Sequence, residues 1–377
     1  METYYLAAIC ATVPGLGRSK LPQLLEKLGG AARLWTAGFE ELLQTGLVTA
    51  QQAEQFLAHR QEGLPERLAG FCTKQGVKLI TFKDENYPKS LQEIHDKPLV
   101  LYVRGELPQA PYALAIVGSR AASAYGLEAA ELFSRAMALQ GIPVISGGAR
   151  GVDTAAHRGC LDAGGKTVAV LGCGIDRVFP AENKELFREI VARGGAIVSE
   201  YAPGVAPFAN NFPARNRIIV GLSQGVLVTE CALKSGAVIT ANLGADEGRD
   251  VYCVPGNIFN GGSRGCHMLI RNGAQLVESP EDILKDLSEW QSSKRKGAEQ
   301  NIFTMKCPPV EISQDNKYGK LSEQEQALLK LLGRGRLTLA EIIDKQGGTL
   351  AALGTLLLDL QVAGIVAQDN AQRYYLK

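Results

Sequence analysis

The feature that most constrains the fold is a regular alternation of short apolar runs with helical stretches between residues 111 and 288. The runs are almost continuously apolar, whereas a strand with one wet face would alternate apolar and polar side chains. Strands buried on both faces predict a mainly parallel α/β sheet with helices on both sides. The predicted strands are LAIVG (114–118), IPVIS (142–146), TVAVLG (167–172), AIVS (196–199), GVLVTE (225–230) and DVYCVPG (250–256).

Glycines and polar residues gather where these strands end, which is where ligands bind in sheets of this kind. The first turn, AIVGSRAASAYG, offers the hydroxyl of Ser119 and the guanidinium of Arg120, which can pair with a phosphate. The second strand is followed by an amide-rich loop of Ser146, Gly147 and Gly148. These loops predict an anion site. The first turn lacks G-x-G-x-x-G, which argues against a dinucleotide cofactor.

Two later segments add cations and hydroxyls to the predicted anion site. FPARNRIIVGLSQG begins with basic residues at a helix start and continues as a buried apolar run, and TECALKSGAVITA follows the fifth strand. The residues that they supply are Arg215, Asn216, Arg217, Lys234, Ser235 and Gly236. Phe208 and Phe212 are either platforms on which unpaired bases stack or packed side chains.

The stretch GCLDAGGKT (159–167) is close to a phosphate-binding P-loop in sequence. A P-loop follows a strand and opens a helix, whereas this stretch follows a helix and enters a strand, so we expect no ATP site. Lys166 is kept as a single phosphate contact. Asp153 and His157 share a helix face and are expected to hold the preceding loop rather than act as an acid–base pair. No nucleophile, base and orienting group occur together, so no catalytic residue is assigned.

Charge and cysteine usage limit the class of protein. Forty basic and 39 acidic residues leave a net charge of +1, which argues against a chain coated in positive charge but is compatible with a local basic groove. The eight cysteines are scattered and form no C-x-x-C pair, which favours reduced thiols over a metal site. We recognise neither a signal peptide nor a run that could cross a bilayer. The prediction is a cytoplasmic protein without metal or cofactor.

We place the predicted sheet domain at residues 66–288. A helical domain precedes it, and two further strands lie at its start. Residues 1–65 predict short helices, in which VPGLGRSKLPQLLEKLG and LLQTGLVTAQQAEQFL share one plan. They form either a pair of helix-hairpin-helix units, whose glycine turns approach phosphates, or a small bundle that uses glycines only as turns. Val77–Phe82 and Leu99–Val103 predict strands at the entry to the sheet domain.

The sequence after the sheet domain predicts a linker at 289–319 and a second small unit at 320–377. This unit has a helix capped by Ser322 and Glu325, two further helices, and a hairpin that turns at Asp369-Asn370, an order typical of a winged helix. Its LAALGTLLLDLQV segment (350–362) offers almost no side chain that reads base edges. We therefore expect this unit to contact protein or to pack within the molecule.

Six motifs in order resemble the DprA/Smf family of DNA-processing proteins: YPKSLQEIHDKPLVLYVRG, AIVGSRAASAYG, SGGARGVDTAAH, FPARNRIIVGLS, SGAVITA and RDVYCVPG. The resemblance implies a SAM-like helical domain, an extended Rossmann-like domain and a winged-helix tail. It implies a protein, not an enzyme, that binds and protects single-stranded DNA during natural transformation. The implied partners are the RecA recombinase, for which no contact residues can be placed, and a second copy bound through the Rossmann domain. It also implies that the residues of the predicted anion site and Lys166 contact DNA. These residues are Ser119, Arg120, Ser146, Gly147, Gly148, Lys166, Arg215, Asn216, Arg217, Lys234, Ser235 and Gly236.

An enzyme acting on nucleotides is the alternative. A related Rossmann family of nucleoside monophosphate phosphoribohydrolases carries P-G-G-x-G-T-x-x-E after a late strand. Here the corresponding region reads GVLVTECALKSGAVITA and lacks the glycine pair and the matching acid. One further departure is GGSRGCHMLIRNGA, in which Cys266 and His267 stand where small polar residues are expected.

Overall fold

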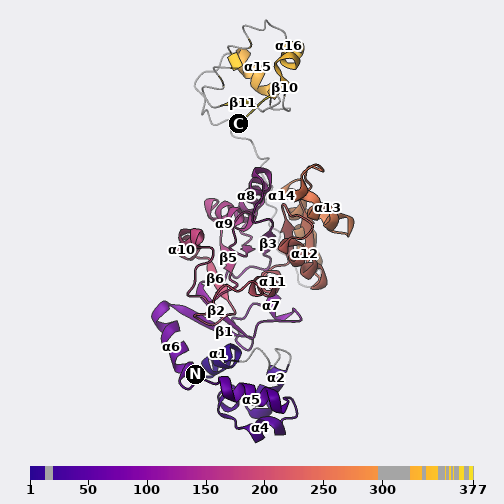
Figure 1. Cartoon of the computed structure of the whole chain (residues 1–377). Helices are drawn as coiled ribbons and strands as arrows, with labels where there is room; N and C mark the ends of the chain where they lie inside the picture. Colours follow the sequence, from indigo (N-terminus) through magenta and orange to yellow (C-terminus); the bar gives the residue numbers. More distant parts are fainter. Residues whose placement is uncertain are drawn as a thin grey trace. The chain divides into compact units, whose positions relative to one another are not determined.

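The computed structural model describes residues 1–12, 20–295, 323–332 and 337–346, with shorter stretches at 353, 356–357, 360, 365–368 and 373–376. The chain forms two compact units, Met1–Glu299 and Gln300–Lys377. Figure 1 shows the sheet of the first unit with the N-terminal helices beside its β1–β2 edge. The proposed boundary at residue 65 stays a prediction, because both regions belong to the first unit.

The sheet of the first unit confirms the mainly parallel α/β prediction. Its strand order is β1-β2-β6-β5-β4-β3-β7-β8-β9. Neighbours from β6 to β9 are parallel, whereas β1 and β2 run antiparallel to their neighbours at one edge. The strands are β1 (Val77–Thr81), β2 (Val100–Gly105), β3 (Leu114–Val117), β4 (Val144–Ser146), β5 (Thr167–Val170), β6 (Ala196–Ser199), β7 (Gly225–Val228), β8 (Asp250–Cys253) and β9 (Gln275–Leu276).

Helices cover both faces of this sheet, as continuous apolar strands require. Leu114 and Ile116 of β3 pack towards one set of helices, and Ala115 and Val117 pack towards the other. The first set comprises α8 (Ala124–Leu139), α9 (Val152–Asp162) and α14 (Pro280–Arg295), with α10 (Lys184–Ala192) next to α9. The second set comprises α7 (Lys89–Gln92), α11 (Asn211–Gly221), α12 (Gly236–Asp246) and α13 (Arg264–Arg271).

The N-terminal helices share a hydrophobic core with β1 and β2, because Val77, Val100 and Tyr102 are buried among them. The helices are α1 (Glu2–Thr12), α2 (Leu21–Leu28), α3 (Ala31–Thr36), α4 (Phe39–Gln44), α5 (Ala50–His59) and α6 (Leu64–Gln75). The helix predicted to begin at Thr49 does begin there. The Thr49 side chain accepts a hydrogen bond from the Gln52 amide in a capping box. Gly15 and Gly17 lie outside the described residues, so the hairpin interpretation stays a prediction.

The second unit combines α15 (Glu323–Leu332) and α16 (Leu339–Gln346) with a sheet of order β10-β12-β11. β11 (Val366–Gln368) and β12 (Arg373–Leu376) are antiparallel, as the predicted hairpin requires, and β10 is Leu337–Thr338. Ser322, the turn at 369–370 and most of the predicted third helix lie outside the described residues. The winged-helix interpretation therefore stays a prediction. In the first unit, α14 continues to Arg295 and so extends into the segment predicted as a linker.

Candidate nucleic-acid interface

A cavity of about 660 Å³ lies at the carboxyl edge of the sheet, between the turn after β3 and the starts of α11 and α12. Half of the predicted contact residues line it: Ser119, Arg120, Arg215, Asn216, Ser235 and Gly236. We call this cavity and its border the rim. Its size is within the range of small-ligand pockets, and its position follows the rule for parallel sheets.

Two helices of eleven residues begin at the rim, and the positive ends of their dipoles favour an anion there. At the start of α11 the amides of Asn211 and Phe212 already donate to the carbonyls of Phe208 and Ala209, and Pro213 has no N–H. α12 is capped by Ser235, whose hydroxyl accepts a hydrogen bond from the Ala237 amide at 3.2 Å. α11 brings Pro213 and Asn216 to the cavity. The start of α11 confirms that FPARNR is a helix end and that the apolar run Ile218–Val220 is its buried continuation.

Arg120 is the exposed cation that lines the cavity. Its guanidinium lies 5.2 Å from the centre of the Phe212 ring, a cation–π contact that holds the charge at the rim. Phe212 in turn lies 5.4 Å from Phe179, with the two rings tilted at 40°. Phe208, on the segment before α11, is 63% exposed. Phe208 is therefore available for stacking, whereas Phe212 is partly packed.

Arg215 lines the cavity from within and is 3% exposed, so it does not extend freely from the helix. Its Nη1 donates to the carbonyl oxygens of Gly147, at 2.6 Å, and Val170. Burial lowers the pKa of Arg215 to about 10, and the carboxylate of Asp153 opposes this shift. Arg215 therefore contributes positive charge beneath the rim and links the loop after β4 to the last residue of β5.

The loop of Ser146, Gly147 and Gly148 is buried, contrary to the expectation of an open phosphate loop. The Ser146 hydroxyl donates to the Ile116 carbonyl at 2.7 Å. A Cβ on Gly147 would lie 2.6 Å from an Arg215 nitrogen, and one on Gly148 would lie 2.8 Å from the Phe187 ring. The glycines thus leave room for neighbouring side chains of the protein itself.

Arg217 points away from the cavity and is enclosed, which corrects the expectation that it is free to meet a phosphate. Its Nη2 lies 2.6 Å from Glu200 and its Nε lies 2.9 Å from Asp96, and its side chain is 8% exposed. Burial alone would lower the pKa of Arg217, but the two carboxylates raise it. Arg217 therefore ties α11 to the residues after β6 and before β2.

Lys166 is exposed but lies at the opposite edge of the sheet, because it directly precedes β5 and the cavity lies where the strands end. The structure therefore does not bring Lys166 to the rim. Lys234 is exposed immediately before Ser235 and lies beside the cavity. The stretch GCLDAGGKT occupies the end of α9 and enters β5, which is the order of elements that the sequence predicts for it.

Asp153 and His157 lie on α9 and are both buried; Asp153 holds the preceding loop as expected, whereas His157 contacts the start of β5. Asp153 accepts a hydrogen bond from the Ala149 amide at 3.1 Å, and burial raises its pKa against the opposing charge of Arg215. His157 Nδ1 lies 2.7 Å from the Thr167 hydroxyl. Burial lowers the pKa of His157 to about 3.

Two residues that were not predicted lie on the loop after β5. Phe179 is 40% exposed and stacks on Phe212, and Arg177 is exposed and donates through Nε to the Gly204 carbonyl at 3.1 Å. Both follow a predicted strand, and this position was the signal that could have revealed them.

Cys266 and His267, the unexpected pair, face inward. Cys266 Sγ lies 3.9 Å from Cys231 Sγ, and His267 Nε2 lies 3.0 Å from the Gly256 carbonyl. Within the described ranges, no group of three His, Cys, Asp or Glu residues is placed to hold a metal. None of the helices described is both long and apolar enough to cross a membrane.

The sequence profile of the DNA recombination-mediator protein A family matches residues 78–288, which is more than half of the chain. The chain belongs to the DprA/Smf family. It is 38% identical to protein Smf of Escherichia coli over 86% of this chain and 84% of the relative. It is 44% identical to DNA processing protein DprA of Streptococcus pneumoniae over 57% of this chain and 76% of the relative.

Two experimental structures of family members resemble the chain. The X-ray structure of DprA from Streptococcus pneumoniae has a TM-score of 0.62 at 34% identity and covers 75% of this chain and 97% of that protein. DprA from Helicobacter pylori, studied for its single-stranded DNA binding mode, has a TM-score of 0.51 at 30% identity. It covers 56% of this chain and 96% of that protein.

Proposed function

We propose that this DprA/Smf protein binds single-stranded DNA along the rim. The observation that carries the proposal is the convergence of the exposed Arg120, the side chains of Asn216 and Ser235, and two helix N-termini on one cavity. The positive helix ends and a guanidinium suit the phosphate backbone, and the exposed Phe208 offers a face to an unpaired base. The single-strand binding described for the Helicobacter pylori relative supports this assignment.

The contact set differs from the one that sequence predicts. Direct contacts are assigned to Ser119, Arg120, Asn216, Lys234 and the Ser235–Gly236 turn, all of which are at least partly exposed. Arg215 acts as a buried positive charge beneath the strand, and the buried Ser146–Gly148 loop holds Arg215 in place. Arg217 positions α11, and Lys166 lies outside the path.

The wider role that we propose is that of a mediator of natural transformation, which protects the incoming strand and loads the RecA recombinase onto it. It follows from membership of a recombination-mediator family, and we assign no residues to the RecA contact. We also propose a homodimer through the Rossmann-like domain. The exposed apolar side chains Leu233 and Ile239 near α12, which are 49% and 46% exposed, are compatible with such an interface.

Binding of a fluorescent oligothymidine, compared with its duplex counterpart across a salt series, tests the proposal. Wild type is compared with Arg120→Ala and with the matched control Arg188→Ala, which removes an exposed arginine on α10. We expect strand-selective, salt-sensitive binding that Arg120→Ala weakens and Arg188→Ala leaves unchanged. Equal losses in both variants would contradict the rim assignment. No binding by wild type would favour the nucleotide-enzyme alternative, which release of ribose 5-phosphate from a nucleoside monophosphate then tests.

A further inference from the structure

The outer face of α8 carries three large apolar side chains that are seven residues apart. Tyr125, Leu132 and Leu139 are 48%, 54% and 69% exposed. Residues at this spacing lie almost in line along a helix, so the three form one strip of apolar surface, which we call the α8 stripe. Single exposed apolar side chains are common on protein surfaces, but a row with this spacing is the pattern by which one helix packs on another.

The charged residues on one side of the α8 stripe are opposite in sign at its two ends. Glu128 and Arg135 are both exposed and are also seven residues apart. Arg135 lies 3.8 Å from Asp162 of α9, but both side chains are more than half exposed, so this ion pair contributes little. Glu131 lies about 100° round the helix from Leu132 and points away from the stripe. The side of the stripe is therefore negative towards the start of α8 and positive towards its end.

This pattern of apolar and charged residues is complementary to a second copy of itself. Leu132 lies midway between Tyr125 and Leu139, so in an antiparallel pair of α8 helices Tyr125 of each copy faces Leu139 of the other. The twofold axis of such a pair passes near Leu132. The same arrangement brings Glu128 of each copy close to Arg135 of the other, whereas a parallel pair would place like charges side by side. Charge therefore selects the antiparallel arrangement.

We propose that the α8 stripe is a contact between two copies of this chain, packed antiparallel about Leu132. α8 and α12 cover opposite faces of the sheet (Figure 1), so this contact is separate from a homodimer formed near Leu233 and Ile239 and does not depend on it. A chain with two self-complementary patches builds assemblies larger than a dimer. A 16-residue helix is only about 24 Å long, so we expect this contact alone to associate at micromolar concentrations.

Cross-linking of the full chain at introduced cysteines tests the geometry, in a Cys10→Ser background because Cys10 is exposed. A short bis-maleimide should link Leu132→Cys to a second copy of itself, because this residue lies at the twofold axis. Tyr125→Cys and Leu139→Cys should each link poorly alone, whereas a mixture of the two variants should link well. Arg188→Cys, at an exposed position on α10, is the matched control and should not link. The background without an introduced cysteine reports linkage through any other thiol.

Charge reversal and sedimentation velocity test the pairing. Glu128→Arg and Arg135→Glu each place like charges together and should raise the dissociation constant of the contact about tenfold at low salt. The double variant restores opposite charges and should recover association. Leu132→Glu should lower the mass of the assembly without changing the urea midpoint, because the side chain is exposed. The proposal would be overturned by an unchanged mass in Leu132→Glu, by no linkage between chains in Leu132→Cys, or by a double reversal that does not rescue.

Discussion

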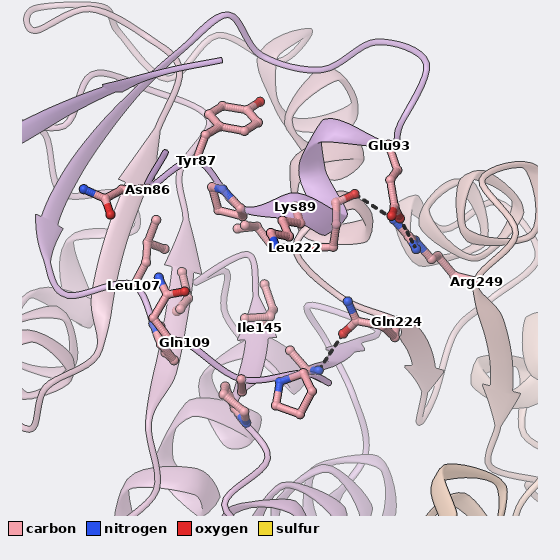
Figure 2. A pocket seen from close by; sticks show the side chains of 18 of the residues that line it. Asn86, Tyr87, Lys89, Glu93, Leu107, Gln109, Ile145, Leu222, Gln224 and Arg249 are labelled. Carbon is pink, nitrogen blue, oxygen red and sulfur yellow. Dashed lines mark hydrogen bonds and ion pairs between the residues drawn. The ribbon is translucent and has the colours of Figure 1, made fainter. Parts of the chain in front are cut away.

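The two edges of the same parallel sheet carry cavities of different character. At the carboxyl edge, the rim draws positive charge from the starts of α11 and α12 and from Arg120. At the amino edge, beside a second cavity of about 1020 Å³ (Figure 2), α11 and α12 end and the four-residue α7 begins, and the cations that line this cavity are Arg249 and Lys89. Strand direction therefore decides at which edge of the sheet helix N-termini gather and favour an anion. At the other edge, positive charge depends on individual side chains.

Two arginines that lie two residues apart on α11 have separate roles. Arg215 and Arg217 are both buried, but the first supports the cavity and the second pairs with Glu200 and Asp96 on the far side. The exposed Arg120 is the residue that can meet a strand.

The largest effect is expected for Arg217→Ala, which leaves the Glu200 carboxylate buried without its cation. Breaking such a pair costs about 3–5 kcal/mol of the free energy of unfolding, measured by urea denaturation followed by circular dichroism. Arg188→Ala, which breaks an exposed pair, is the control and should change stability by less than about 1 kcal/mol. Unchanged stability with loss of DNA binding would return Arg217 to the contact set.

The free energy of unfolding is expected to change by about 2 kcal/mol with pH because of His157, which is buried on α9. Its folded pKa of about 3 is below the ordinary value of 6.5, so the unfolded chain binds the proton first as the pH falls. The stabilisation is complete above pH 6.5 and declines as the pH falls towards 3. Between pH 8 and pH 5 the loss should reach about 2 kcal/mol. Denaturation of His157→Gln should show a shallower pH dependence, and an identical slope would contradict this origin.

At the rim, Arg120→Ala should weaken binding of oligothymidine about tenfold without changing the urea midpoint. Loss of one phosphate contact should also lower the salt slope by about 0.7, the value for single strands. The measurement is fluorescence anisotropy at four salt concentrations. A reduced affinity with an unchanged salt slope would mean that Arg120 acts through the Phe212 ring rather than on a phosphate.

The smallest effect is expected for Phe208→Ala, at about 1 kcal/mol, or roughly fivefold in affinity, the lower end of the range for one stacked base. Because no charge is removed, the salt slope should stay at the wild-type value, in contrast to Arg120→Ala. Phe208→Tyr keeps the ring and serves as the control. A loss in the tyrosine variant equal to that in the alanine variant would exclude stacking.

The motifs predicted residues that the structure brings to one cavity, but not the burial or pairing of each side chain. Ser119, Arg120, Asn216 and Ser235 follow or flank predicted strands and do line the cavity. Lys166, expected as a single phosphate contact, directly precedes β5 and therefore lies at the opposite edge of the sheet from the rim. Phe179 was missed although it follows a predicted strand, because the loop after β5 carries no glycine–serine signature, and its contact with Phe212 is decided by the fold.

The sequence alone determined the parallel sheet, the strands, the family and the edge at which the rim forms, because apolar runs and the residues after them are local patterns. Only the tertiary structure decided which arginine is exposed. Arg215 and Arg217 have the same local sequence context, but one meets the carbonyls of Gly147 and Val170 and the other meets Glu200 and Asp96. Burial and pairing depend on residues that are distant in sequence, and a motif does not contain them.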